Sequence, residues 1–273
     1  MYGLDSAGEV YEFTPFKPDY RLPARAYLDR SEEGQEALLC YTDAEAEDQG
    51  ACAEFFCLSS GRLEEDVYGA AGLIQISLPV RAFSEHLAIS DFFREICQIA
   101  VPIQGTAGFG LTCPVDRREA HLATVENGRY QDAIETFPAL EANAREDDPG
   151  DNDATLETGY KRTIRTTGWL TILGNSMLKR LGGRSHIIKV ISDHPSIEIV
   201  DYGEGVIIRC GNWPILGDKH DRPLPKEYGV VARLVKPLRC KLTRPTMLYG
   251  SNYESYEERD KAFAKWRARF DNF

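Results

Sequence analysis

Two histidines stand close to acidic residues, and they are the side chains with which this chain could transfer protons. His194 follows Asp193, and His220 comes two residues after Asp218. An imidazole titrates near neutral pH, and a neighbouring carboxylate can orient it for general acid–base catalysis. The pairs therefore raise one enzymatic hypothesis, a small-molecule hydrolase. We prefer to interpret them as polar loop residues, because the chain has neither a Gly-x-Ser-x-Gly nucleophile motif nor a Gly-Lys-Ser/Thr phosphate loop.

The sequence contains no motif that is typical of a metal site or a cofactor site. The chain has seven cysteines, an odd number, and Cys52 and Cys57 are five residues apart, which is not a zinc-ligand spacing. Gly108-Phe109-Gly110 lacks the third glycine of a dinucleotide-binding loop. We therefore expect no cofactor and no metal site, and we interpret the cysteines as reduced core residues.

Carboxylates are the remaining abundant group, and they are unevenly distributed. Residues 1–158 contain 11 Lys and Arg against 31 Asp and Glu, a net charge of −20, whereas residues 159–273 contain 21 against 12, a net charge of +9. Two acidic clusters are our candidates for binding a partner. The first cluster is Glu45, Glu47, Asp48, Glu64, Glu65 and Asp66, and the second is Glu146, Asp147, Asp148, Asp151 and Asp153.

The second cluster has two other interpretations. It does not match a calcium-binding EF-hand, because no glutamate follows Gly150 at the required distance. The run 141–153 also contains a proline and a glycine, which is typical of a solvated loop. A loop without a binding role and an acidic surface facing a partner both remain open on composition alone.

The first half of the chain contains the pattern of a strand, a helix and a second strand. Residues 73–80 alternate, and the apolar side of the alternation predicts a strand with one buried face (Ile74, Ile76, Leu78 and Val80). Residues 84–100 predict a helix whose apolar stripe is Ile89, Phe92, Phe93, Ile96, Ile99 and Ala100. Residues 106–113 predict a strand that contains glycine, and a further helix is expected near 120–137.

The second half is organised around residues 163–241. Trp169, Leu173, Met177 and Leu181 are spaced by four, which predicts a helix over 169–182 that ends at Gly182-Gly183. The Ile- and Val-rich runs 196–201 and 205–210 predict a hairpin. Helices are expected over 225–236, with the inner stripe Tyr228, Val231 and Val235, and over 252–270, with the stripe Phe263, Trp266 and Phe270.

These elements predict an α+β fold, with antiparallel or mixed sheets covered by amphipathic helices and two α+β halves packed as one globular unit. We divide the chain into an acidic N-terminal region (1–69), a first α+β half (70–140), an acidic linker loop (141–158) and a second α+β half with the C-terminal helix (159–273). No run approaches the roughly 20 apolar residues that span a bilayer. The N-terminus lacks the pattern of a secretory signal. We therefore expect a cytoplasmic protein that does not bind membranes.

The segment 163–241 resembles a known family. The motifs are Gly168-Trp169-Leu170-Thr171-Ile172-Leu173-Gly174, Leu181-Gly182-Gly183, the strand 205–211, Leu216-Gly217-Asp218 and the stretch 228–239. They are similar to those of the immunity proteins of type VI secretion systems that neutralise VRR-Nuc nuclease toxins. The strand at 73–80, the helix at 84–100 and the glycine-containing stretch 105–110 fit the same family in the same order.

The resemblance implies an antitoxin that binds a cognate nuclease and blocks DNA cleavage, with no catalysis of its own. The acidic front half agrees with this, because a nuclease presents a basic cleft and opposite charges speed association. We do not expect direct binding to nucleic acid, since the acidic half would repel phosphates. A small-molecule hydrolase that uses a His/Asp pair and an immunity protein against an unrelated toxin are the alternatives.

Overall fold

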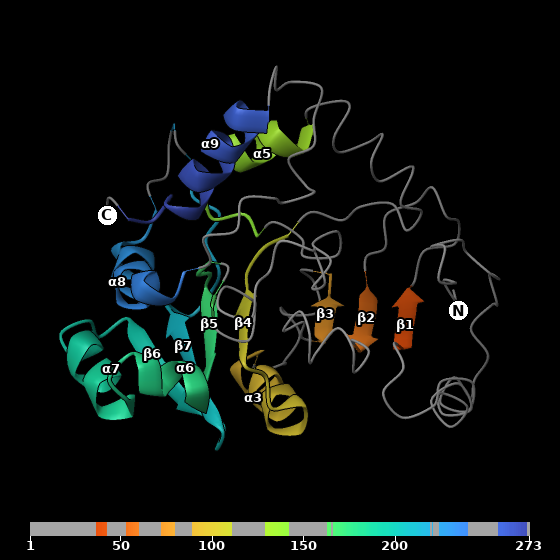
Figure 1. The fold of residues 1–273 in the computed structure, drawn as a ribbon. Coiled ribbons are helices and arrows are strands. Elements are labelled where there is room, and N and C mark those ends of the chain that lie inside the picture. Colours follow the sequence, from red (N-terminus) through yellow and green to blue (C-terminus); the bar gives the residue numbers. More distant parts are fainter. Residues whose placement is uncertain are drawn as a thin grey trace.

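A computed structural model describes residues 37–42, 53–59, 72–79, 89–110, 129–141, 163–164, 166–218, 220, 224–239 and 256–271. In these residues the chain forms two antiparallel sheets and a set of helices (Figure 1). The α+β fold class is therefore confirmed.

The larger sheet has four strands in the order β4-β5-β7-β6, and every pair in it is antiparallel. Its strands are β4 (Gln104–Ala107), β5 (Leu170–Gly174), β7 (Gly205–Cys210) and β6 (Ile197–Asp201). All residues of β5 are buried, as are most of β7, because these two central strands are covered on both faces. The predicted hairpin is β6–β7, and it is confirmed. The edge strand β4 belongs to the range 70–140, so one sheet joins residues on both sides of the acidic linker.

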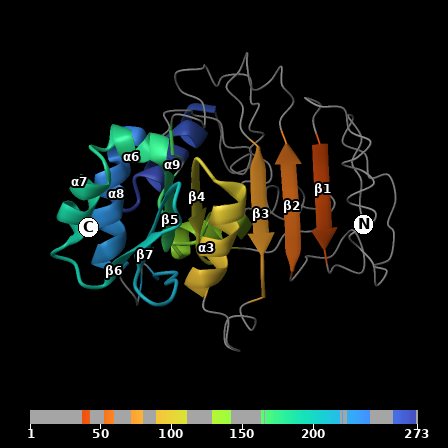
Figure 2. The same ribbon diagram turned by 90° about the horizontal axis from the view of Figure 1, so that it is seen from below.

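Helices cover both faces of this sheet. Arg209 and Cys210 are neighbours in β7, so their side chains point to opposite faces. The guanidinium of Arg209 donates a hydrogen bond to Ser90 of α3 (Ile89–Ala100), whereas Cys210 lies near Tyr228 of α8 (Lys226–Val235). The arrangement is three layers, with α3 on one side and α8 on the other (Figures 1 and 2).

The predicted helix over 169–182 is wrong in its first part. Residues Leu170–Gly174 form strand β5, and the helix that follows, α6 (Asn175–Arg180), begins only at Asn175. A spacing of four does not distinguish the two structures, because residues four apart share a face in a strand as well as in a helix. Gly182 and Gly183 do end the helix, with positive φ angles of 88° and 87°. Helix α7 (Arg184–Ile191) follows and was not predicted.

The smaller sheet has the order β1-β2-β3 and lies beside β4 and α3 (Figures 1 and 2). Its strands are β1 (Ala37–Thr42), β2 (Glu54–Ser59) and β3 (Leu73–Ser77). The strand predicted at 73–80 is therefore present, but the prediction that its alternating apolar side is buried is wrong at Ile74, which is 44% exposed.

The remaining helices agree with the predicted positions. Helix α8 begins after Pro225, and its stripe Tyr228, Val231 and Val235 is almost fully buried. A short 3-10 helix, η4 (Lys236–Leu238), follows it at Pro237. Helix α9 (Tyr256–Arg267) and helix α5 (Arg129–Thr136) pack together through a small cluster around Trp266 and Ile134. Among the described helices, none has the length and apolar character to cross a bilayer.

Candidate functional site

The eleven acidic residues that we predicted to bind a partner all lie outside the described residues. They are Glu45, Glu47, Asp48, Glu64, Glu65, Asp66, Glu146, Asp147, Asp148, Asp151 and Asp153. Their role stays a prediction. Two other acids are described, one from the acidic N-terminal region (1–69) and one from the linker range (141–158), and the carboxylate of each lies against the fold.

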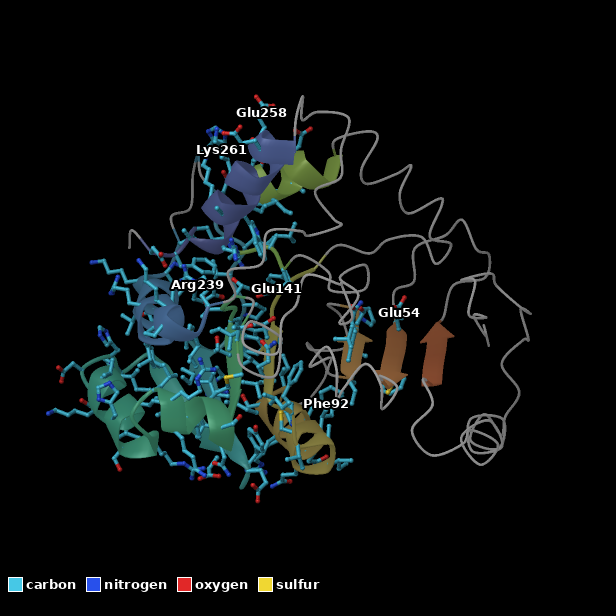
Figure 3. The ribbon with its side chains drawn as sticks, in the orientation of Figure 1. Glu54, Phe92, Glu141, Arg239, Glu258 and Lys261 are labelled. Carbon is cyan, nitrogen blue, oxygen red and sulfur yellow. The ribbon has the colours of Figure 1, made fainter. Side chains whose placement is uncertain are left out.

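Glu54 and Glu141 are these two residues. Glu54, at the start of β2, is only 8% exposed. Glu141 accepts a hydrogen bond from the hydroxyl of Thr106 at 3.3 Å, and its side chain fills the space over Gly168, where an added Cβ would overlap with the carboxylate. Figure 3 places Glu141 between the four-stranded sheet and the α5–α9 pair. Counting acids along the chain therefore overstates the acidic surface, because at least these two carboxylates serve the fold.

The described histidines lie on different elements. His194 lies in the loop between α7 and β6, and His186 is exposed on α7. The carboxylate of Asp218 accepts the backbone N–H of His220 at 2.8 Å, which closes a local turn. Within the described part of the chain, no three His, Cys, Asp or Glu side chains are grouped so that they could hold a metal ion.

The C-terminal end of α3 presents the most exposed large apolar side chain of the described residues. Ile99 is 85% exposed and Val101 is 50% exposed. We predicted that Ile99 lies on the buried stripe of this helix, and that prediction is wrong. The buried side is centred on Ile89 and Cys97, which are 8% and 1% exposed, and Phe93 packs beside them.

Val101 adopts a left-handed backbone conformation, with φ 46°. A β-branched residue is a rare occupant of that region, because its side chain crowds the backbone. The next two residues explain why the chain turns so sharply. The carbonyl of Pro102 accepts a hydrogen bond from the Tyr202 hydroxyl at 3.1 Å, and the carbonyl of Ile103 accepts one from the N–H of Gly174 at 2.9 Å.

Gly174 leaves no room for a side chain under this connection, since an added Cβ would lie 2.7 Å from the Pro102 carbonyl oxygen. The close approach of the two backbones therefore requires glycine at this position. Burial raises the pKa of the Tyr202 hydroxyl well above its ordinary value, so it stays protonated and can donate to Pro102.

The loop 211–218 presents a second pair of exposed apolar side chains. Trp213 is 52% exposed and Ile215 is 44% exposed. The loop backbone is nevertheless tied down on both sides. The indole N–H of Trp169 donates to the Gly211 carbonyl at 3.0 Å, the Ile215 N–H donates to the Tyr228 hydroxyl at 3.1 Å, and the Leu216 carbonyl accepts the N–H of Ala139 at 2.9 Å.

One ion pair closes the C-terminus onto the core. The guanidinium of Arg239 donates to both carboxylate oxygens of Asp271, at 2.7 Å and 3.0 Å, and both side chains are nearly buried. Lys236 adds a contact of 3.1 Å. These cations hold the pKa of Asp271 below its ordinary value of 3.8.

The exposed apolar residues were missed for different reasons. The stripe assigned to α3 left out Cys97, and including it would have moved the buried centre away from Ile99. Trp213 and Ile215 follow a predicted strand in a stretch with glycine and proline, which is a recognisable loop, and an aromatic in such a loop is a usable signal of an exposed anchor. The left-handed angle of Val101 has no signal in the sequence.

A family model described as "TsiV: Type VI immunity for VRR-NUC" matches residues 14–270. The chain is also similar in structure to a solved protein described as "Pseudomonas aeruginosa T6SS protein PA0821", with a TM-score of 0.71 and 22% sequence identity. That likeness covers 92% of this chain and 68% of the other, and at this identity it shows a shared fold. No curated protein matches the sequence.

Proposed function

Because the chain belongs to the family of type VI immunity proteins for VRR-NUC, we propose that it binds one cognate VRR-Nuc nuclease and holds it inactive without any catalysis of its own. The observation that carries this proposal is the family match, which runs over residues 14–270. It includes all the described helices and strands and both acidic clusters. The resemblance of the motifs in 163–241 and the match of the family model over residues 14–270 lead to the same family.

The charge distribution supports a nuclease as the partner. A nuclease must hold phosphates and so needs a basic surface. An inhibitor whose first 158 residues carry a net charge of −20 is attracted to that surface over a distance of roughly a Debye length, which raises the association rate. We propose that the two acidic clusters supply this attraction, with the second lying in a linker (141–158) between two α+β halves. The inhibitor has to be present in the compartment where the nuclease cleaves DNA, so we propose a cytoplasmic location.

Titration of nuclease activity tests the proposal. Increasing amounts of the purified protein are added to a fixed amount of the VRR-Nuc nuclease, and cleavage of plasmid DNA is followed. We expect inhibition to be complete near a one-to-one molar ratio. Complete protection at a small fraction of that ratio would indicate turnover and would contradict binding as the mechanism. No effect at any ratio, with protection against a different toxin, would favour immunity to an unrelated partner.

A variant with both His194→Ala and His220→Ala separates binding from hydrolysis. Both histidines lie in loops, so the fold should tolerate their removal. We expect the double variant to inhibit the nuclease as the parent protein does. Loss of protection with an unchanged melting temperature would instead support the hydrolase hypothesis.

A further inference from the structure

We infer that the exposed edge of α3, formed by Asp91, Glu95, Ile99 and Val101, is where the nuclease docks. This inference rests on the proposed function and adds the surface that performs it. Ile99 and Val101 enter an apolar pocket of the nuclease, and Glu95 with Asp91 faces the basic groups around that pocket. Four features of the structure support this edge.

The first feature is the exposure of Ile99. At 85% it is the most exposed of the large apolar side chains in the described residues, and Val101 at 50% is close to it in the chain. Ile99 lies in the last turn of α3 and Val101 directly follows the helix, whose other large apolar residues are buried or half-buried. An apolar side chain that a fold leaves in water gains free energy when a partner covers it, at about 25 cal/mol for each Å² removed from water.

The second feature is the backbone of Val101. Glycine would adopt its φ of 46° without strain, whereas valine does not. Strained residues of this kind are concentrated at functional sites, because the fold alone gains nothing from them. A valine whose side chain is half exposed contributes little to the core, so what it offers is an apolar side chain held in a set direction at the surface.

The third feature is the anchoring of α3 at both ends. At its start, Ser90 accepts a hydrogen bond from Arg209 of β7, and Arg209 also pairs with Glu198 of β6. After its end, the carbonyl of Pro102 accepts a hydrogen bond from the Tyr202 hydroxyl, and the carbonyl of Ile103 accepts one from the N–H of Gly174. The edge is therefore organised before the partner arrives, which lowers the conformational entropy lost on binding.

The fourth feature is charge. Asp91, Glu95 and Ile99 are spaced by four on one face of α3, and all three are exposed. Arg94 pairs with Asp91 at 3.1 Å and partly neutralises it, so Glu95 carries most of the negative charge beside Ile99. The competing loop 211–218 contains one carboxylate, Asp218, and it accepts the backbone N–H of His220. Opposite charge around an apolar centre fits a partner with a basic surface.

The experiment measures binding of the full chain to the purified VRR-Nuc nuclease by surface plasmon resonance. Ile99→Ser removes the apolar contact at a position where the fold has little to lose, and we expect the dissociation constant to rise about 30-fold or more. The matched control is Trp213→Ser, which removes an exposed apolar side chain from the loop 211–218. We expect the control to bind like the parent protein.

Charge reversal tests the acidic part of the docking edge, which consists of Asp91 and Glu95. Glu95→Lys should lower the association rate several-fold in low salt, and the difference should shrink in high salt, because screening weakens the interaction. Asp193→Lys changes the net charge equally, on the loop before β6, and should have a smaller effect. Equal effects of the two variants would mean that only net charge matters and would contradict docking at Glu95.

Val101→Gly separates docking from folding. Relief of the left-handed strain should raise the melting temperature by about 2 °C while the lost side chain weakens binding. A variant that is more stable but binds more weakly cannot be explained by misfolding. If the parent protein binds the nuclease and Ile99→Ser and Val101→Gly bind equally well, the docking edge is wrong and the proposed function stands. If the parent protein does not bind the nuclease, both are wrong.

Discussion

Both ends of the four-stranded sheet carry exposed apolar side chains, but the backbone that holds these side chains is fixed differently at each end. At one end, the strands β4 and β5 meet α3 and the turn of the β6–β7 hairpin, and the exposed side chains are Ile99 and Val101. At the other end, β7 runs into the loop 211–218, where Trp213 and Ile215 are exposed. Both ends hold apolar side chains in water on a backbone that other elements fix in place.

The difference lies in how the backbone is fixed. The loop end relies on hydrogen bonds to Trp169, Tyr228 and Ala139, and its positive φ angles belong to two glycines, Gly211 and Gly217. The α3 end adds close backbone packing at Gly174 and Gly205 to its hydrogen bonds at Pro102 and Ile103, and it tolerates a strained valine. The loop end is therefore a relaxed structure, and the α3 end is one in which the fold maintains a conformation that its own sequence disfavours. This difference is why we place the docking edge on α3.

Gly205→Ala should produce the largest change, because it breaks the α3 end directly. An added Cβ at Gly205 would overlap with the Leu173 carbonyl and the Tyr202 hydroxyl, so β5 and the hairpin turn would have to separate. We expect a loss of about 3 kcal/mol in the free energy of unfolding, measured by urea denaturation. Gly203→Ala is the control: it has φ 98° but open space, and it should cost only about 1 kcal/mol.

Asp271→Asn should have the next largest effect and tests how α9 is held near the loop end, where Trp266 packs against Leu216. The change leaves the nearly buried Arg239 without its carboxylate, at a cost of about 2 kcal/mol. Glu257→Gln, in the exposed pair with Lys261, should cost about 0.3 to 0.5 kcal/mol.

The ion pair between Arg239 and Asp271 also predicts that stability depends on pH. Since the pKa of Asp271 is lower in the folded protein than its ordinary 3.8, its contribution is complete above that value and is lost as the pH falls through the folded pKa. Unfolding free energies measured between pH 5 and acid should therefore converge for the parent protein and Asp271→Asn. Parallel curves down to the lowest pH would contradict the assignment.

Two tyrosine variants compare the ends through single hydrogen bonds. Tyr228→Phe leaves the Ile215 N–H without its acceptor, and Tyr202→Phe leaves the Pro102 carbonyl without its donor. We expect each to cost about 1 kcal/mol. Hydrogen exchange should then be faster in 213–216 for Tyr228→Phe, with the α3 end unchanged. For Tyr202→Phe the change should appear at the α3 end. A uniform increase over both ends would mean that they are not independent.

Exchanging valine and glycine at positive φ should give effects as small as those of the tyrosine variants, but of opposite sign at the two ends. Val101→Gly should raise the free energy of unfolding by about 1 kcal/mol, whereas Gly211→Ala, at φ 78°, should lower it by about the same amount. Opposite signs of similar size, measured by thermal melting, would confirm that one end is strained and the other is not. A destabilised Val101→Gly would show that the valine side chain contributes more to packing than its exposure indicates.

Local patterns predicted the regular parts of this fold well. The hairpin β6–β7, the helix α8 with its buried stripe and the stop at Gly182-Gly183 all follow from residue periodicity and from glycine and proline positions. These signals are local, since they depend on residues within a few positions of each other. The prediction failed at 169–174 because a spacing of four fits a strand as well as a helix, and only the pairing of β5 with β4 and β7 decides between them.

The candidate site was harder to predict, because exposure depends on what covers a side chain. The apolar residues of α3 look alike in the sequence, yet Cys97 is buried against the sheet and Ile99 is not. From the sequence, Glu141 is predicted to belong to an acidic loop. In the structure its side chain lies over Gly168 and accepts a hydrogen bond from Thr106. The eleven acids predicted to bind the partner fall outside the described residues, so their contribution remains a prediction.

The sequence by itself determined the family, the α+β class and the opposite charges of the two halves, because these depend on composition, periodicity and motifs along the chain. Only the tertiary structure decided which apolar and acidic side chains reach the surface. The reason is that burial is set by contacts between distant segments, such as Tyr202 with Pro102 and Arg209 with Ser90, and no pattern of neighbouring residues encodes them.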